Sequence, residues 1–191
     1  MGENRPIVVA VSGASGAPIA VRLLEWLRKA RVPAALVVSA GGRKVVEAET
    51  DIDIARLSKL AARTYADDDL AAPIASGTQP TRGMVVVPCS SNTVARLALG
   101  LGDSLIARAA HVHLKEGRRL VVVPRETPLP TVMLRHLTTL SELGVVVLVA
   151  SPAFYLKPRT IEDVTDYLVG KILDQFGLRH RLYRPWGSDS G

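Results

Sequence analysis

Residues 7–18 read IVVAVSGASGAP, and this stretch indicates the fold class. Its first part, Ile7–Val11, is apolar and mostly β-branched, which predicts a short strand buried on both faces. Glycines and hydroxyl side chains follow in Ser12–Pro18, and an apolar repeat with helical spacing comes next, at Ile19, Leu23, Leu27 and Ala30. A strand, a glycine-rich turn and a helix in this order are typical of the first unit of a doubly wound α/β fold.

Further short apolar runs predict the other strands of the sheet, each expected to be buried on both faces: Ala35–Val38, Met84–Val87, Leu120–Val123 and Val145–Val149. They alternate with helical stretches, the last of which has its apolar stripe at Ile161, Val164, Leu168 and Ile172. We expect a single Rossmann-like doubly wound domain over residues 1–177, with a mostly parallel sheet covered by helices on both faces. Residues 178–191 are expected to form a C-terminal tail that closes over the site.

Composition limits the classes of function. The chain has 191 residues, is 48% hydrophobic, and has Cys89 as its one cysteine, so it can form one core but no intrachain disulfide. Ile7–Val11 is too short for a signal sequence or a membrane span, and we therefore expect a cytoplasmic protein. The net charge is +6, but the arginines are scattered and only 4% of residues are aromatic. This favours small phosphate-bearing ligands over nucleic acid as partners.

The turn Ser12–Pro18 has the chemistry of a phosphate or flavin loop. Its glycines permit close backbone approach, its hydroxyls can donate to phosphate oxygens, and the helix that follows is expected to offer free N–H groups to an anion. The turn lacks the full G-x-G-x-x-G spacing, so it does not favour a dinucleotide. An ordinary tight connection is the structural alternative.

Two more predicted strands end in hydroxyl-bearing residues. One run ends at Ser39, and another leads into residues 88–93, PCSSNT. Ser90 or Thr93 alone could simply cap a helix. Because the carboxyl ends of parallel strands meet at one edge of the sheet, three such ends favour a mononucleotide site. No acidic residue is placed for an adenosine ribose, and this favours FMN over FAD.

The remaining strand ends add a cation and a phenol. Residues 124–130 read PRETPLP, in which Arg125 could supply a forked donor to a phosphate or flavin oxygen. The alternative for Arg125 and Glu126 is a surface ion pair in a proline-rich loop. Residues 151–155, SPAFY, place the Tyr155 hydroxyl beside an apolar wall at the same edge.

Seven segments in this order resemble the UbiX flavin prenyltransferase family, which is related to the flavin-containing cysteine decarboxylases. They are SGASGAP, the AETD around Glu49, PCSSNT, the HLKE around Lys115, RETP, SPAFY and the helix around Lys171. The resemblance covers nearly the whole chain. It implies FMN as the bound flavin, reduced FMN as the prenyl acceptor, dimethylallyl phosphate as the donor, and a UbiD-type decarboxylase as recipient of the prenylated product. It also implies a homododecamer with sites between subunits.

The resemblance also assigns residues. The flavin-binding set is Gly13, Ala14, Ser15, Ser39, Ser90, Ser91, Asn92, Thr93 and Arg125. The residues that hold the prenyl phosphate are Lys115, Tyr155 and Lys171, and the catalytic group is Ser15, Glu49, Glu126, Lys115 and Trp186. Lys171 stands where arginine is common in the family. Lysine keeps the charge but lacks the planar fork of arginine.

Simpler structural roles exist for several of these residues. Glu49 and Lys115 could be solvated helix charges, Lys171 could extend along an apolar stripe, and Trp186 could belong to a loose tail. The histidines show no metal-binding spacing, so we expect no catalytic metal.

Two other functions remain open. The first is an FMN-dependent oxidative decarboxylase of the cysteine decarboxylase type, a class that uses a histidine after its second strand. Residues 40–66 contain no histidine and offer Glu49 instead. The second is a non-catalytic flavin carrier, which would have no need of Glu49, Lys115 and Glu126 in their family positions.

Overall fold

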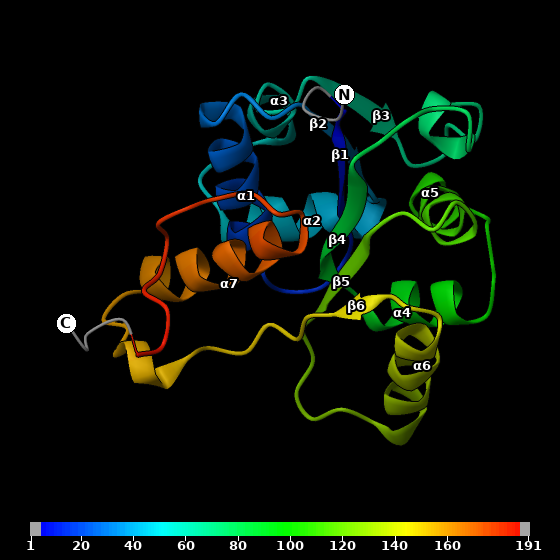
Figure 1. The fold of residues 1–191 in the computed structure, drawn as a ribbon. Coiled ribbons are helices and arrows are strands. Elements are labelled where there is room, and N and C mark those ends of the chain that lie inside the picture. The colour runs from blue at the N-terminus through cyan, green and yellow to red at the C-terminus, as the bar shows by residue number, and fades with distance from the viewer. Residues whose placement is uncertain (1–4, 188–191) are drawn as a thin grey trace.

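The computed structural model describes residues 5–187, and these form one parallel β-sheet with helices on both faces (Figure 1). Six strands lie in the order β3-β2-β1-β4-β5-β6 within this part of the chain. Their bounds are β1 Ile7–Val11, β2 Ala34–Val38, β3 Arg63–Ala66, β4 Gly83–Cys89, β5 Leu120–Pro124 and β6 Val146–Val147. All neighbouring strands pair in parallel, which confirms the predicted Rossmann-like class.

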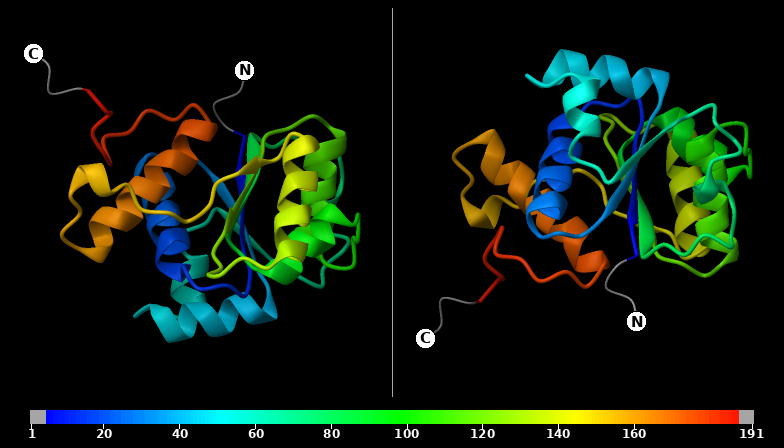
Figure 2. Two further views of the ribbon diagram at one scale, coloured as in Figure 1. Left: turned by 90° about the horizontal axis from the view of Figure 1, so that it is seen from below. Right: turned by 90° about the horizontal axis from the view of Figure 1, so that it is seen from above.

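Two layers of helices cover the sheet (Figures 1 and 2). One layer contains α1 (Ala17–Lys29) and α7 (Ile161–Gln175), and the other contains α4 (Ser91–Ala98), α5 (Leu105–Lys115) and α6 (Thr131–Glu142). Successive residues of β1 point to opposite faces, so Val9 packs in the core under α1 and α7 while Val8 packs in the other core. Burial on both faces explains the unbroken apolar runs of the central strands. Shorter helices complete the fold: α2 Ala40–Glu49, α3 Ile54–Ser58, η1 Pro73–Ala75 and η2 Phe154–Leu156.

The edges of the sheet differ from the prediction. β3, with the sequence RTYA, is mostly exposed and has no apolar run, so the sequence did not indicate it. It joins the sheet through backbone pairing with β2. At the other edge β6 spans only Val146–Val147, and Val149 is 43% exposed, so the expected burial of both faces was wrong there. Edge strands need less apolar sequence because only one neighbour covers them.

Both predicted apolar stripes form helices, but one end of each is not buried. Ala30, at the end of the first stripe, is the exposed C-cap residue of α1. Ile161, the first residue of α7, is 73% exposed, whereas Leu168 and Ile172 lie in the core. The stripe therefore faces the sheet only from the second turn onward. The described part of the predicted tail, residues 178–187, runs beside α7 and η2 (Figure 1). None of the helices in residues 5–187 combines the length and apolar character needed to cross a bilayer.

Candidate functional site

A buried hydroxyl fixes two strand-end loops to each other. The Ser12 hydroxyl donates to the carbonyl of Pro88 at 3.0 Å and accepts the backbone N–H of Ser90 at 2.8 Å. It thereby joins the loop after β1 to the loop after β4. The three predicted hydroxyl-bearing ends, after β2, β1 and β4, are neighbours in the sheet. They are not consecutive in the chain, because β3 lies between β2 and β4.

The serines that end β2 and β4 are helix N-caps. Ser39 accepts the N–H of Gly42 at 3.0 Å, and Ser90 accepts the N–H of Thr93 at 3.3 Å. The capping alternative is therefore correct for Ser90, and it is compatible with a binding role because each cap satisfies only one of the free N–H groups at its helix start. Within residues 5–187 no acceptor bonds the remaining first-turn N–H groups of Ala40, Gly41, Ser91 and Asn92.

The start of α1 differs from the expectation. The Glu49 carboxylate, at the end of α2, accepts the N–H of Gly16 at 2.8 Å and that of Ala17 at 3.0 Å. These are the N–H groups that the sequence assigned to an anionic ligand, so that expectation was wrong for this helix. The protein supplies its own anion here, at the positive end of the helix dipole.

Glu49 is consequently more than a solvated helix charge. Burial opposes its ionisation, but hydrogen bonds from Ser15, Gly16 and Ala17, together with the charge of Arg125, hold the pKa of its carboxyl below the ordinary value. Glu49 thus lies next to two residues of the predicted site, Ser15 and Arg125.

A cavity of about 570 Å³ opens at the carboxyl edge of the sheet, and we call it the sheet-edge cavity. All nine residues of the predicted flavin set line it, together with Glu126: Gly13, Ala14, Ser15, Ser39, Ser90, Ser91, Asn92, Thr93 and Arg125. Its volume falls in the usual range for a small-molecule site. Close backbone contact shapes one wall, since a Cβ added to Gly13 would lie 3.2 Å from Cα of Gly41. With free N–H groups at the starts of α2 and α4, the cavity fits a phosphate-bearing mononucleotide.

Sequence reasoning missed several residues of this cavity. Asp67, directly after β3, accepts the N–H of Ile106 through Oδ1 at 2.9 Å and so holds the start of α5 at the cavity. Recognition of β3 would have indicated Asp67 as a further strand-end residue. Arg96 lies on α4 and pairs with Asp103 at 3.4 Å, and nothing in its sequence context distinguishes it from a surface arginine. The other missed wall residues are Ala40, Gly41, Ser104, Ile106 and Ala107.

Glu126 lines the sheet-edge cavity and is hydrogen-bonded to a neighbouring hydroxyl there. Its carboxylate accepts the Ser91 hydroxyl at 3.3 Å and the backbone N–H of Thr127 at 3.2 Å. Both Arg125 and Glu126 are exposed. No ion pair joins the two residues in the described part of the chain, so the surface-pair alternative is not observed.

Tyr155 and Trp186 lie at a second cavity, of about 910 Å³, which we call the tail cavity. Its walls are formed by residues 153 and 155–159, the first half of α7 and the tail residues 182–187. The two rings pack edge to face with their centroids 5.0 Å apart, although Trp186 is 80% exposed. Lys171 lies further along α7, with Nζ 3.4 Å from Oδ2 of Asp174 and 5.9 Å from the centroid of the Tyr183 ring.

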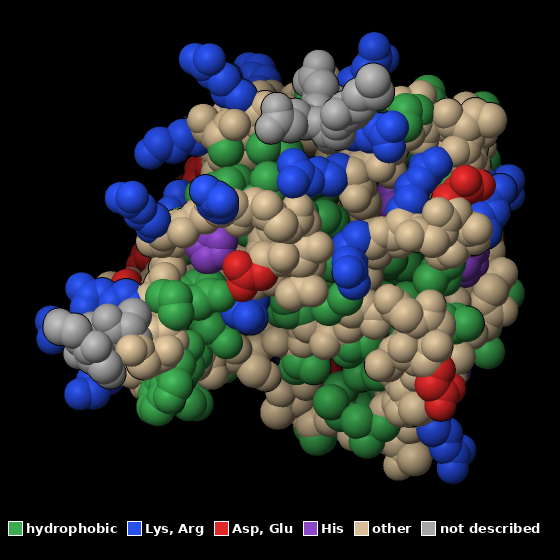
Figure 3. All heavy atoms as spheres, in the orientation of Figure 1, with side chains coloured by type: hydrophobic (Ala, Val, Ile, Leu, Met, Phe, Trp, Pro, Cys, Tyr) green, Lys and Arg blue, Asp and Glu red, His purple; other side chains and the backbone are tan. Residues whose placement is uncertain are grey.

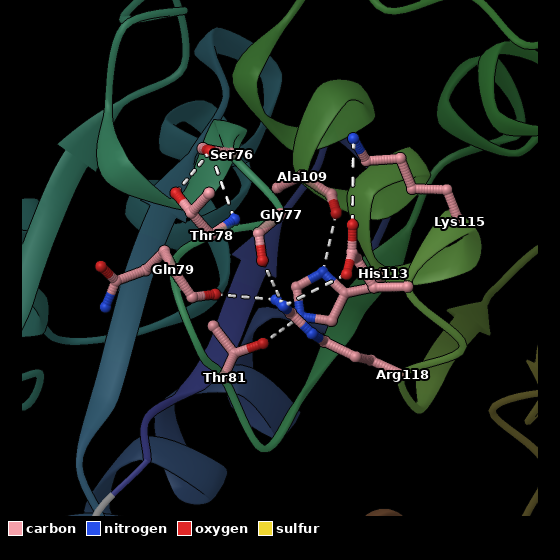
Figure 4. A network of polar contacts seen from close by, with 10 residues as sticks. Ser76, Gly77, Thr78, Gln79, Thr81, Ala109, His113, Lys115 and Arg118 are labelled. Carbon is pink, nitrogen blue, oxygen red and sulfur yellow. Dashed lines mark hydrogen bonds and ion pairs between the residues drawn. The ribbon is translucent and has the colours of Figure 1, made fainter.

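Lys115 lies apart from both cavities in a single chain. It ends α5, whose first turn reaches the sheet-edge cavity, and a helix of 11 residues is about 16 Å long. Its side chain is 64% exposed, with Nζ 4.0 Å from Glu116 (Figure 4).

A polar network lies beside Lys115 (Figure 4). The buried His113 bonds the Thr81 hydroxyl and the carbonyl of Ala109. Arg118 donates to the carbonyls of Gly77 and Gln79. These contacts fix the end of α5 against the segment before β4.

Lysines and arginines are spread over the face seen in Figure 3 and do not gather into one patch. Among residues 5–187 no group of three or more His, Cys, Asp or Glu side chains is arranged to hold a metal ion. The sheet-edge cavity with its flavin-set walls is therefore the best-defined candidate site of the described chain.

The strand order and a cavity at the carboxyl ends define a Rossmann-like protein with a candidate mononucleotide site. The profile of the Flavoprotein family matches residues 1–173. The chain is 49% identical over 180 residues to the flavin prenyltransferase UbiX of Thermoplasma acidophilum, covering 94% of this chain and 99% of that relative. The chain therefore belongs to the Flavoprotein family and, within it, to the UbiX-type flavin prenyltransferases.

Solved structures agree with this membership. The crystal structure of AnUbiX (PadA1) in complex with FMN and dimethylallyl pyrophosphate is similar with a TM-score of 0.94 and 42% identity, covering 96% of this chain and 97% of that chain. The dodecameric FMN-dependent UbiX-like decarboxylase from Escherichia coli O157:H7 has a TM-score of 0.93 and 43% identity, with coverages of 95% and 98%. The cysteine decarboxylase TvaF shares only the fold, with a TM-score of 0.67 and 15% identity over 91% of this chain and 98% of TvaF.

Proposed function

We propose that the protein is a flavin prenyltransferase that joins the dimethylallyl group of dimethylallyl phosphate to N5 and C6 of reduced FMN. The observation that carries this proposal is the sheet-edge cavity, where all nine predicted flavin residues surround one space with Glu126 at its wall. The named activity of the T. acidophilum relative supports the same reaction class. The ligands of the AnUbiX structure support FMN and a dimethylallyl phosphate ester as the two reactants.

The cavity favours FMN over a dinucleotide. Its free N–H groups at the starts of α2 and α4 can bind one phosphate group. The usual dinucleotide position, at the start of the first helix, is filled by the Glu49 carboxylate. Extraction of the bound flavin and chromatography should therefore yield FMN, and FAD as the sole bound species would contradict the site.

The first chemical step breaks a carbon–oxygen bond and forms a carbon–nitrogen bond. Reduced FMN supplies a nucleophilic nitrogen at N5. As the bond from the allylic carbon to the phosphate oxygen breaks, Lys115, Lys171 and the Tyr155 hydroxyl stabilise the negative charge on the departing phosphate. Fixed donors of this kind usually provide the largest share of catalysis, and losing one costs about 3 kcal/mol. The face of the Trp186 indole stabilises the allylic cation.

The second bond joins C6 to the far end of the prenyl group. C6 loses a proton and the prenyl double bond gains one, so the closure is an isomerisation that needs no oxidant. We assign the proton transfer to Glu126 with Ser15 as a hydroxyl relay. Glu49 holds the start of α1 beside Ser15 and so maintains the position of that hydroxyl.

The residues assigned to the reaction lie far apart within one chain, and this supports assembly of several copies of the chain. Lys115 lies at the far end of α5, and Tyr155 and Trp186 line the tail cavity rather than the sheet-edge cavity. We propose that neighbouring copies complete the site in a homododecamer, and the dodecameric state of the UbiX-like protein from E. coli O157:H7 supports this assembly. In this assembly the tail would close over the site, and a UbiD-type decarboxylase would receive the product. Residues 188–191 of the tail lie outside the described residues.

The direct test incubates the purified protein with reduced FMN and dimethylallyl phosphate under anaerobic conditions. We expect the released flavin to gain the mass of one dimethylallyl unit, with dimethylallyl diphosphate compared in parallel. An unchanged flavin in the presence of folded protein would refute the proposal. Release of carbon dioxide from a peptide with a C-terminal cysteine, with oxidised FMN bound, would instead support the decarboxylase alternative. Flavin that binds and leaves unchanged in both assays would support a carrier.

A further inference from the structure

Three side chains converge on the carboxylate of Asp174, near the end of α7. The Tyr183 hydroxyl donates to Oδ2 at 2.5 Å, Nζ of Lys171 donates to the same oxygen at 3.4 Å, and Nε2 of His180 lies 3.1 Å from Oδ1. We call these four residues the Asp174 cluster. Two of its members belong to α7 and two to the tail, so the cluster joins the tail to the helix.

The tail side chains pack where only a glycine leaves room. A Cβ added to Gly170 would lie 2.6 Å from the Tyr183 ring and 2.7 Å from the His180 ring. Tyr183 also packs against Tyr167 of α7, with ring centroids 5.3 Å apart. The imidazole of His180 is only 7% exposed. The tail is therefore seated on α7 in a defined position.

The charge states in the cluster keep the bonds in place at neutral pH. Burial opposes ionisation of Asp174, but hydrogen bonds from Tyr183, His180 and Lys171 and the charge of Lys171 hold the pKa of its carboxyl below the ordinary value. Burial and the neighbouring Asp174 raise the pKa of the Tyr183 hydroxyl. Tyr183 therefore stays a donor and Asp174 stays an acceptor.

The anchored segment carries Trp186 of the predicted catalytic group, which contacts the predicted prenyl-phosphate residue Tyr155. Trp186 follows Tyr183 by three positions, and its ring packs on Tyr155 at the tail cavity. Lys171 reaches the same carboxylate from the helix side. Asp174 thus contacts the side chain of one predicted prenyl-phosphate residue, Lys171, and fixes the segment that carries Trp186 of the predicted catalytic group.

We infer that Asp174 is a positioning residue of the proposed prenyl-transfer site, which orients the Lys171 ammonium and anchors the tail that presents Trp186 to Tyr155. This inference rests on the proposed function. A lysine ammonium lacks the built-in geometry of a guanidinium, so an external partner has to restrict its direction. Asp174, three residues further along α7, provides that restriction.

The test compares Asp174→Asn and Tyr183→Phe with Glu162→Gln, which removes a charge from the same helix at an exposed position outside the cluster. Each variant is measured for KM and kcat with dimethylallyl phosphate, FMN affinity, and trypsin cleavage after Arg179 and Arg181. Cleavage after Arg184 is not used because Pro185 follows it.

We expect Asp174→Asn to raise KM for dimethylallyl phosphate roughly tenfold or more, the size of a lost hydrogen bond to a charged group, and to leave FMN affinity unchanged. Tyr183→Phe removes the bond between the tail and Asp174, so it should expose the tail to trypsin. It keeps Asp174 as the partner of Lys171 and should therefore raise KM by less than Asp174→Asn does. Asp174→Glu should recover part of the lost KM, and Glu162→Gln should behave as the wild type.

An Asp174→Asn variant with wild-type KM overturns the inference, whether or not its tail is cleaved. A parallel loss of FMN affinity, kcat and melting temperature also overturns it, because that pattern indicates a purely structural role. If the wild type transfers no prenyl group, the proposed function fails separately. In that case, calorimetric titration of the FMN-loaded protein with dimethylallyl phosphate decides the inference. The Asp174→Asn variant must then bind dimethylallyl phosphate more weakly than the wild type does.

Discussion

The Glu49 carboxylate accepts the backbone N–H of Gly16 at 2.8 Å, across 33 residues of sequence. The bond joins the end of α2 to the start of α1. It places a protein carboxylate where the first helix of a dinucleotide-binding fold receives a phosphate. In the proposed site, this leaves the free N–H groups at the starts of α2 and α4 to bind the flavin phosphate.

Glu49→Gln should lower the free energy of unfolding at pH 7 by about 1 kcal/mol, because a neutral side chain loses the attraction of the helix start. The effect stays small since the side chain is exposed and screened. The pKa of Glu49 is lowered in the fold, so its stabilisation is present above the ordinary value of 4.5 and is lost as pH falls through the folded pKa. Urea titrations should show the two proteins converging in acid. A difference that is independent of pH would contradict this account.

Glu126→Gln should stop the proposed reaction after the first bond. Glutamine keeps the size and the contact with Ser91 but cannot act as a base. Flavin with the prenyl group at a single position should accumulate. It has the same mass as the cyclised product, so single-turnover absorbance and chromatography must separate the two. If Glu126 serves only its bonds to Ser91 and Thr127, the variant forms the cyclised product normally and loses at most about 1 kcal/mol of stability.

Tyr155→Phe should weaken use of dimethylallyl phosphate and leave FMN binding intact. The change removes one donor to an anion, worth roughly 1.5 to 3 kcal/mol, and keeps the ring that packs on Trp186. Steady-state kinetics and flavin fluorescence titration measure the two effects. Tyr65→Phe, on β3, is the matched control. Loss of bound FMN in the Tyr155 variant would assign the residue to the flavin or to the fold.

Arg96→Gln tests which cation receives the flavin phosphate. Arg125 lies close enough to Glu49 to lower the pKa of its carboxyl, whereas Arg96 lines the cavity from α4 with only Asp103 as an ion-pair partner in the described chain. We expect the variant to bind FMN about tenfold or more weakly and riboflavin, which has no phosphate, as the wild type does. Arg108→Gln, on α5, is the control. Equal losses for both flavins would place Arg96 against the ring system instead.

His113 should make the fold sensitive to mild acid. Burial lowers its pKa from the ordinary 6.5, although the carbonyl of Ala109 favours the charged form. The unfolded chain then binds more protons below pH 6.5, so stability rises with pH in this range, by at most about 1.4 kcal/mol per unit. His113→Gln should be less stable at pH 8 but should show a flatter slope between pH 7 and 5, measured by denaturant titration. An unchanged slope would show that His113 does not titrate in this way.

The sequence by itself determined the class of the fold, the central strands of the sheet and the residues predicted to bind the flavin. The β1 run, the turn Ser12–Pro18 and PCSSNT carry local signals: unbroken apolar strands, glycines where backbones approach, and hydroxyls at helix starts. Parallel pairing then places the strand ends at one edge, so a set of residues spread over more than 100 positions lines a single cavity. No long-range side-chain contact has to be known for this step.

Only the tertiary structure decided the rest. β3 pairs through its backbone and has no apolar pattern, so Asp67 and its contact with α5 could not be predicted. The Gly16 N–H donates to Glu49 and the Tyr183 hydroxyl donates to Asp174. Both bonds depend on how the helices and the tail pack, and the local spacing of residues does not specify that packing. The length of α5 separates Lys115 from the cavity that its first turn reaches. Local sequence specifies which elements form and what chemistry they carry, whereas distances between side chains on different elements follow only from the packed fold.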